Sequence, residues 1–93
     1  MSTEQLVFMK QLLENVEYAN ENGVLNVIRL LKYDNSDVRY GTSFALGAFD
    51  TLQKLLELRP DLFTARVVQE LEALSKDNDE RIRSVAKSTL SKL

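Results

Sequence analysis

The sequence predicts an all-α fold of about five helices. Apolar residues recur every three or four positions in five stretches of the chain, which is the spacing of one helix face. The 93 residues include only three Gly and one Pro, too few for the many tight turns of an all-β domain. No run of four or more residues alternates cleanly between apolar and polar with turn residues at both ends, so we expect no strand.

The first two helices are predicted on either side of an Asn-rich turn. Four residues at helical spacing form the apolar stripe of the first helix: Leu6, Met9, Leu13 and Val16. We expect this helix to end at Asn20–Gly23, because Asn-Gly is a strong turn signal and Gly accepts the positive φ of a helix C-cap. A second, shorter helix follows, with one apolar face made by Val24, Val27, Ile28 and Leu31.

The third helix is predicted to be the longest. Six residues from Val38 to Leu56 share one face: Val38, Thr42, Ala45, Phe49, Leu52 and Leu56. Asn35 or Ser36 is expected to be its N-cap. Gly41 and Gly47 then fall inside the helix, where we expect a neighbouring helix to approach closely. Arg59–Pro60 ends it, since the residue before Pro avoids the α region.

Two further helices are predicted after Pro60. The fourth begins between Asp61 and Thr64 and carries the stripe Val67, Leu71 and Leu74. A polar break from Ser75 to Asp79 follows, in which Asp77 or Asn78 is expected to cap the fifth helix. The stripe of the fifth helix continues to the last residue: Ile82, Val85, Ala86, Thr89, Leu90 and Leu93.

An internal repeat is visible when the chain is aligned with itself at an offset of 44 residues. The matched pairs are Val24 with Val68, Val27 with Leu71, Leu30 with Leu74, Val38 with Ile82, Arg39 with Arg83, and Leu46 with Leu90. A period of about 40–47 residues with two helices per unit is typical of helical solenoids. One hairpin cannot bury its apolar face alone, so a neighbour must cover it. We therefore expect one domain over residues 1–93, with a capping or partial-repeat helix (1–23) and two repeats (24–59 and 60–93).

The segments Leu30–Leu46 and Leu74–Leu90 resemble the HEAT and armadillo repeat families. Each has a leucine at the end of the first helix, an Asp/Asn-rich turn and Val-Arg or Ile-Arg opening the second helix. The resemblance implies a short α-solenoid of HEAT-like helical hairpins; a closed antiparallel bundle is the alternative. HEAT repeats often carry an Asp six residues before the Arg. Asp77 has that position before Arg83, whereas Tyr33 occupies it before Arg39.

A narrower resemblance covers only the first half. The stretch Leu12–Asn20, followed by Gly23-Val24-Leu25 and Ala45-Leu46-Gly47, is similar to the armadillo domain of nucleotide-exchange factors for the seventy-kilodalton heat-shock chaperones. The last two helices do not extend this match. The resemblance implies an exchange-factor-like armadillo domain as an alternative function.

Composition excludes several classes of function. The chain has no Cys and no His, so it lacks a thiolate nucleophile and the commonest general base and metal ligand. Lys plus Arg is 12 and Asp plus Glu is 14, and this acidic balance disfavours nucleic acid as the main partner. No calcium loop, phosphate loop or dinucleotide fingerprint has its required spacing. We expect no enzyme, with no catalytic residue, no metal and no cofactor.

The expected function is a non-enzymatic protein–protein interaction module of scaffold, adaptor or assembly-chaperone type. The repeat resemblance implies that the inner helices line a concave binding face, and the candidate partner-binding residues on it are Tyr40, Ser43, Asp50, Lys54, Arg83 and Lys87. A nucleic-acid-binding HEAT-like protein is an alternative, for which several basic residues would have to converge: Arg29, Lys32, Arg39, Arg81, Arg83 and Lys87. Phe8 and Phe44 lie outside the main stripes and are expected to pack between repeats rather than form an exposed contact.

Charge and the last residues suggest further expectations. Residues 1–23 carry four acidic and one basic side chain, and residues 76–93 carry five basic and three acidic ones. Such an acidic head and basic tail could support head-to-tail self-association. No apolar run approaches the roughly 20 residues that span a bilayer, so we expect no membrane partner and a cytoplasmic location. Ser91-Lys92-Leu93 matches a peroxisomal address, which makes the peroxisome the alternative location.

Overall fold

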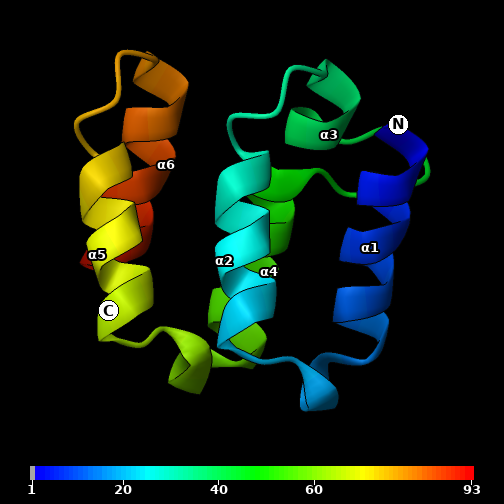
Figure 1. Ribbon diagram of the computed structural model, residues 1–93, viewed down its shortest axis with the longest axis horizontal. Coiled ribbons are helices and arrows are strands. Elements are labelled where there is room, and N and C mark those ends of the chain that lie inside the picture. Colours follow the sequence, from blue (N-terminus) through cyan, green and yellow to red (C-terminus); the bar gives the residue numbers. More distant parts are fainter. Residues whose placement is uncertain (1) are drawn as a thin grey trace.

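The computed structural model describes residues 2–93 and is all-helical over that range, which confirms the predicted fold class. Six α-helices and two short 3-10 helices follow one another: α1 (Ser2–Glu14), η1 (Val16–Tyr18), α2 (Glu21–Leu30), α3 (Ser36–Tyr40), α4 (Ala48–Leu58), η2 (Pro60–Leu62), α5 (Ala65–Leu74) and α6 (Glu80–Ser91). Figure 1 shows α1, α2 and α5 in a row, with α4 behind α2 and α6 behind α5. The molecule is therefore flat, with principal extents of 30 × 28 × 18 Å.

The core lies between these two layers, with α4 at its centre. Helix α4 packs against α1, α2, α3 and α6. Its inward residues are fully buried, as are those of α2 and α5; the set includes Leu52, Leu55, Val24, Val27, Val67 and Leu71. All of these residues except Leu55 belong to the apolar stripes that the sequence predicts, so the 3.6-residue period correctly identifies the buried faces of α2 and α5 and part of that of α4. The stripe predicted for the last helix runs too far, because α6 ends at Ser91 and Leu93 is 53% exposed.

The single long third helix predicted from Val38 to Leu56 is wrong. Helix α3 ends at Tyr40 and α4 begins at Ala48, and residues 41–47 form a tight loop in which Gly41 pairs with Leu46. Gly41 has φ +91°, a conformation that side-chain-bearing residues rarely adopt. A Cβ atom on Gly47 would lie 2.6 Å from the carbonyl oxygen of Arg39. The glycines thus permit a close approach within the loop's own backbone, not the approach of a neighbouring helix.

Phe44, at the tip of this loop, also departs from expectation. Its side chain is 95% exposed, so the prediction that it packs between repeats is wrong. Phe8 instead packs against the core from a partly buried position, as expected. Phe8 lies on helix α1, whereas Phe44 lies in the loop between α3 and α4.

Helix ends follow the predicted chemistry but not always the predicted residue. Asn20–Gly23 does not end a helix: α1 stops at Glu14, and the Asn20 side chain accepts a hydrogen bond from Gly23 N (3.0 Å) as the N-cap of α2. Asn35 caps α3 as predicted. Helix α6 is capped by Asp79 and not by Asp77 or Asn78. The capping residue types are those expected for N-caps, and α4 ends before Pro60 as predicted.

Equivalent elements and contacts recur 44 positions apart. Helices α2 and α5 begin at Glu21 and Ala65, and η1 and η2 begin at Val16 and Pro60. Arg39 Nη1 donates to the carbonyl oxygen of Tyr33 (2.7 Å), and Arg83 Nη1 donates to that of Asp77 (2.8 Å). In both halves the arginine therefore fixes the preceding turn through a backbone acceptor. Because the acceptor is a carbonyl group, Tyr33 serves as well as Asp77.

The Asp77 side chain pairs with Lys32, while the guanidinium of Arg83 binds the backbone carbonyl oxygen of Asp77. Its Oδ1 atom lies 3.0 Å from Nζ of Lys32, and its Oδ2 atom accepts a hydrogen bond from Asp79 N (3.0 Å). Asp77 is only 16% exposed in its side chain. The hydrogen bond from Asp79 and then the Lys32 ammonium lower the pKa of Asp77 below its ordinary value. The carboxylate thus links the turn before α6 to the turn after α2.

Acid is expected to remove the stabilisation that the Asp77 carboxylate provides. Its folded-state pKa is lower than its unfolded-state value of about 3.9, so the stabilisation is complete above that pH and is lost as the pH falls through the folded-state pKa. Asp77→Asn keeps an oxygen acceptor but loses the charge. We expect the variant to be less stable than the wild type in urea denaturation at about pH 7, with the difference shrinking below about pH 3.9. The exposed Asp34→Asn is the control, and a pH-independent difference for Asp77→Asn would contradict this account.

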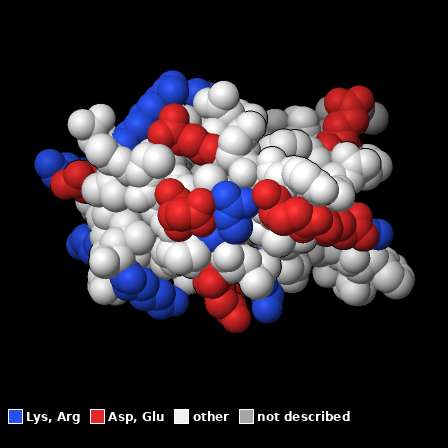
Figure 2. All heavy atoms as spheres, turned by 90° about the horizontal axis from the view of Figure 1, so that it is seen from below, with Lys and Arg blue, Asp and Glu red and all other residues white. Residues whose placement is uncertain are grey.

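Charge is unevenly distributed along the molecule. On the face that carries η1 and η2, acidic side chains gather toward the α1 end and basic ones toward the end formed by α5 and α6 (Figure 2). The two signs remain mixed between these ends. The head-to-tail association expected from the sequence stays a prediction.

Candidate functional site

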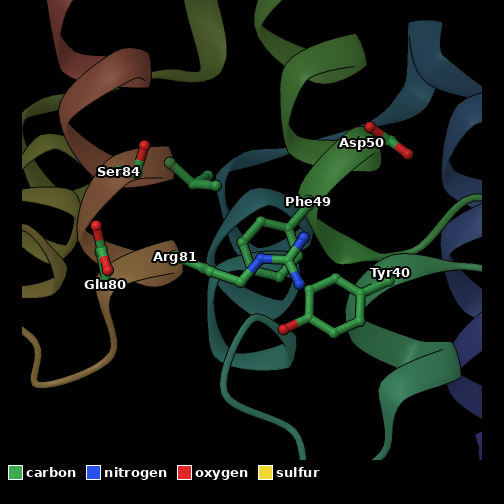
Figure 3. A pocket seen from close by; sticks show the side chains of 7 residues that line it. Tyr40, Phe49, Asp50, Glu80, Arg81 and Ser84 are labelled. Carbon is green, nitrogen blue, oxygen red and sulfur yellow. The ribbon is translucent and has the colours of Figure 1, made fainter.

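A hollow of about 450 Å³ opens between α3, the start of α4 and the start of α6. We call it the Tyr40 hollow. Its lining comprises Tyr40, Phe49, Asp50, Glu80, Arg81, Ser84 and Val85. Figure 3 shows Arg81 reaching from α6 toward the rings of Tyr40 and Phe49, which come from the other wall.

The glycine loop brings the two aromatic residues together. Tyr40 is the last residue of α3, and Phe49 lies in the first turn of α4. The loop over residues 41–47 reverses the chain between them, so the rings stack with centroids 5.1 Å apart and planes inclined by 15°. In one continuous helix these residues would be nine positions apart, too far to stack. The broken helix therefore creates the aromatic wall of the hollow.

Arg81 lies against this wall. Its Cζ atom is 4.4 Å from the centroid of the Tyr40 ring, and that of Arg39 is 5.4 Å from the same centroid. A guanidinium stacked on a ring is attracted by the ring's electrons and leaves its edge N–H groups available. Within residues 2–93, the side chain of Arg81 makes no ion pair or hydrogen bond. It is thus held in place while its donors remain available for a carboxylate.

Two acidic residues complete the rim. In Figure 3 the carboxylates of Asp50 and Glu80 lie on opposite sides of the aromatic pair. Both residues are exposed. The Tyr40 hollow thus combines an apolar floor, formed by Phe49 and Val85, with charges of both signs at its edge.

The structure gathers only part of the predicted site. Tyr40 and Asp50 line the hollow. Ser43 is exposed in the loop and Lys54 is exposed on α4, one turn after Asp50, and neither lines the hollow. The guanidinium of Arg83 donates to the carbonyl oxygens of Asp77 (2.8 Å) and Asn78 (2.9 Å), so it is half-buried and already engaged. Lys87 is exposed on the same flank of α6 as Arg83.

The sequence pattern did not place Arg81, Phe49 or Val85 on the protein-binding face. It named Arg81 only for the nucleic-acid alternative and assigned Phe49 and Val85 to apolar stripes. Ile82 and Ala86 face the core, and at 100° per residue this places Arg81 and Val85 on one flank of α6 and Arg83 on the other. The helical period thus assigns these residues to two opposite flanks of α6, but it does not specify which flank faces α3. The sequence match of Arg39 with Arg83 corresponds to a turn contact that recurs in both halves, whereas the exposed guanidinium of Arg81 lies two residues before Arg83.

Metal and membrane sites receive no support from the described residues. Across residues 2–93, no group of three or more acidic, His or Cys side chains is arranged to hold a metal ion. Of the six α-helices described, none is long and apolar enough to cross a bilayer.

Comparisons with protein-family models, with curated proteins and with solved structures give no match for this chain.

Proposed function

We propose that this chain is a non-enzymatic protein-binding module, of scaffold, adaptor or assembly-chaperone type, which binds a protein partner through the Tyr40 hollow. The observation that carries the proposal is the stack of Phe49, Tyr40 and Arg81 at the surface. Tyrosine and arginine are enriched among the residues that dominate binding energy at protein interfaces. Here both are partly exposed and already held in place, which lowers the entropy lost on binding.

The lining of the hollow suggests what the partner presents. An apolar side chain would cover Phe49 and Val85, and a neighbouring carboxylate would accept hydrogen bonds from Arg81. Asp50 and Glu80 at the rim would disfavour a partner that is acidic throughout. A protein segment of mixed character fits these requirements better than a polyanion does.

Nucleic acid is a weaker candidate for the partner, because the acidic rim of the hollow disfavours a polyanion and because several basic residues are already engaged. Of the basic residues that would have to converge, Lys32 pairs with Asp77, and Arg39 and Arg83 donate to backbone carbonyls. Phosphate binding would require these groups to leave their present partners.

We also infer that the helices form a short HEAT-like solenoid, with residues 1–23, 24–59 and 60–93 as its units. Support comes from the 44-residue recurrence of α2 with α5 and of η1 with η2, and from the two equivalent arginine contacts. Under this proposal α1, which ends 44 residues before α4 does, belongs to a partial first unit.

Arg81→Glu is expected to weaken capture of the partner by at least about tenfold, because it replaces the free guanidinium by a charge that repels a carboxylate. Affinity capture from native lysate, with quantitative mass spectrometry, measures the loss. Lys87→Glu makes the same charge change on the opposite flank of α6 and is the matched control. Both exposed variants should keep the wild-type circular dichroism. Equal capture by wild type and Arg81→Glu, or a loss that Lys87→Glu shares, would show that the Tyr40 hollow is not the binding site.

A further inference from the structure

Phe44 is an exposed aromatic residue on an ordered turn. Its side chain is 95% exposed. The turn itself is fixed: Thr42 N donates to the carbonyl oxygen of Ala45 (2.8 Å), and Thr42 Oγ1 accepts from the backbone N–H groups of Phe44 and Ala45 (both 3.1 Å). The exposure of Phe44 is thus a property of a defined conformation, and binding there would cost little ordering of the backbone.

A hollow lies beside this side chain. The loop passes behind α1 in Figure 1, and a cavity of about 190 Å³ opens between the two segments. Its lining comprises Met9, Lys10, Leu13, Glu14, Phe44, Ala45, Leu46 and Thr51. We call it the α1 hollow. Its lining is largely apolar, and the apolar residues Leu46, in the lining, and Val7, on α1, are both exposed. A projecting Phe and a cavity of matching character therefore occupy the same face.

The α1 hollow carries charges of both signs, so the same surface on a second copy could pair with it. Lys10 and Glu14 lie one turn apart on α1, both line the hollow, and both are exposed. Within residues 2–93, neither takes part in an ion pair. In an interface with two-fold symmetry, residue i of one copy meets residue j of the other, and j meets i. With two α1 helices antiparallel across such an axis, Lys10 of each copy would face Glu14 of the other.

We propose that a second copy of this chain is the occupant of the α1 hollow, forming a symmetric dimer in which Phe44 of each copy enters the hollow of the other. Both requirements of a two-fold interface are present on one face: a projecting side chain beside a cavity, and adjacent charges of opposite sign. The arrangement closes on itself, unlike head-to-tail stacking, which joins unlike surfaces. It uses residues other than those of the Tyr40 hollow and does not depend on the proposed function.

Sedimentation equilibrium over a range of protein concentrations tests the dimer. We expect the wild type to show a monomer–dimer equilibrium, and Phe44→Ser to raise its dissociation constant by at least about tenfold. Tyr18→Ser is the matched control, because Tyr18 is an aromatic residue of η1 that is 80% exposed and does not line the α1 hollow. A wild type that stays monomeric at all concentrations would overturn the proposal. So would self-association that Phe44→Ser leaves unchanged, which is the result expected for head-to-tail stacking.

A charge exchange tests the two-fold geometry. Lys10→Glu and Glu14→Lys should each weaken the dimer, because each places like charges opposite one another. The double variant Lys10→Glu/Glu14→Lys should restore the wild-type dissociation constant, since both cross-axis pairs are re-formed with exchanged signs. Failure of the double variant to recover would reject the antiparallel arrangement of the α1 helices. All these positions are exposed, so circular dichroism should show an unchanged fold.

Discussion

Replacing Gly47 by alanine is expected to lower the free energy of unfolding by about 3 kcal/mol. The added Cβ would lie 2.5 Å from the carbonyl carbon of Tyr40 and 2.6 Å from the carbonyl oxygen of Arg39. These are backbone atoms, and Gly41 N lies closer still, so no side chain can move aside to make room. The loop would have to open, which would separate Tyr40 from Phe49. Urea denaturation followed by circular dichroism measures the change as a lower midpoint.

Gly23→Ala is the matched control for this prediction. Gly23 is also buried, but the nearest atom to its added Cβ is Cδ1 of Leu12 at 3.0 Å, at the end of a flexible side chain. Gly23 lies within α2, where alanine is favoured over glycine by about 0.5–1 kcal/mol. We expect a change within about 1 kcal/mol of the wild type. If both variants lose the same stability, the close backbone approach at Gly47 is not the cause.

The sequence pattern predicted the buried faces of α2 and α5 correctly but missed the break at Gly41. Apolar spacing continues through the loop by coincidence, since Thr42 and Ala45 keep the helical period without being fully buried. Two glycines cost a helix about 1 kcal/mol each, which tertiary packing can offset. Whether the helix continues or breaks therefore depends on the interactions that stabilise the loop. Here these are the Gly41–Leu46 pairing and the hydrogen bonds to Thr42 Oγ1.

The two halves of the chain contain the information that would have revealed this break. Val85 and Ser91 occupy the positions 44 residues after Gly41 and Gly47, and α6 runs as one helix from Glu80 through Val85 to its last residue, Ser91. The two glycines have no counterpart in the second half. This difference between the halves indicates a loop in the first half where the second half has a helix. The site depends on that loop, because it sets the Tyr40–Phe49 stack. Arg81 depends on the long-range packing of α6 beside α3 and α4, which no local pattern specifies.

Leu52→Ala is expected to lower the free energy of unfolding by about 3–4 kcal/mol. Leu52 is fully buried on α4, the helix that packs against α1, α2, α3 and α6. Truncation removes apolar contacts and leaves a cavity that elements from both layers line, and these elements cannot all close on it at once. A chain of 93 residues has a total stability on the order of 5–14 kcal/mol, so this single change removes a large fraction of it.

Leu58→Ala is the matched control, because it makes the same Leu-to-Ala change at an exposed position of the same helix. Leu58 ends the same helix and is 50% exposed, so its truncation leaves little cavity and should cost about 1 kcal/mol or less. The urea denaturation midpoints of the two variants give the comparison directly, provided that their m-values agree. Comparable losses would mean that the stabilising contacts are spread along α4 instead of being concentrated at its buried face. A large excess for Leu52→Ala would show that the two layers share one cooperative core, because a cavity at their common helix would then weaken both.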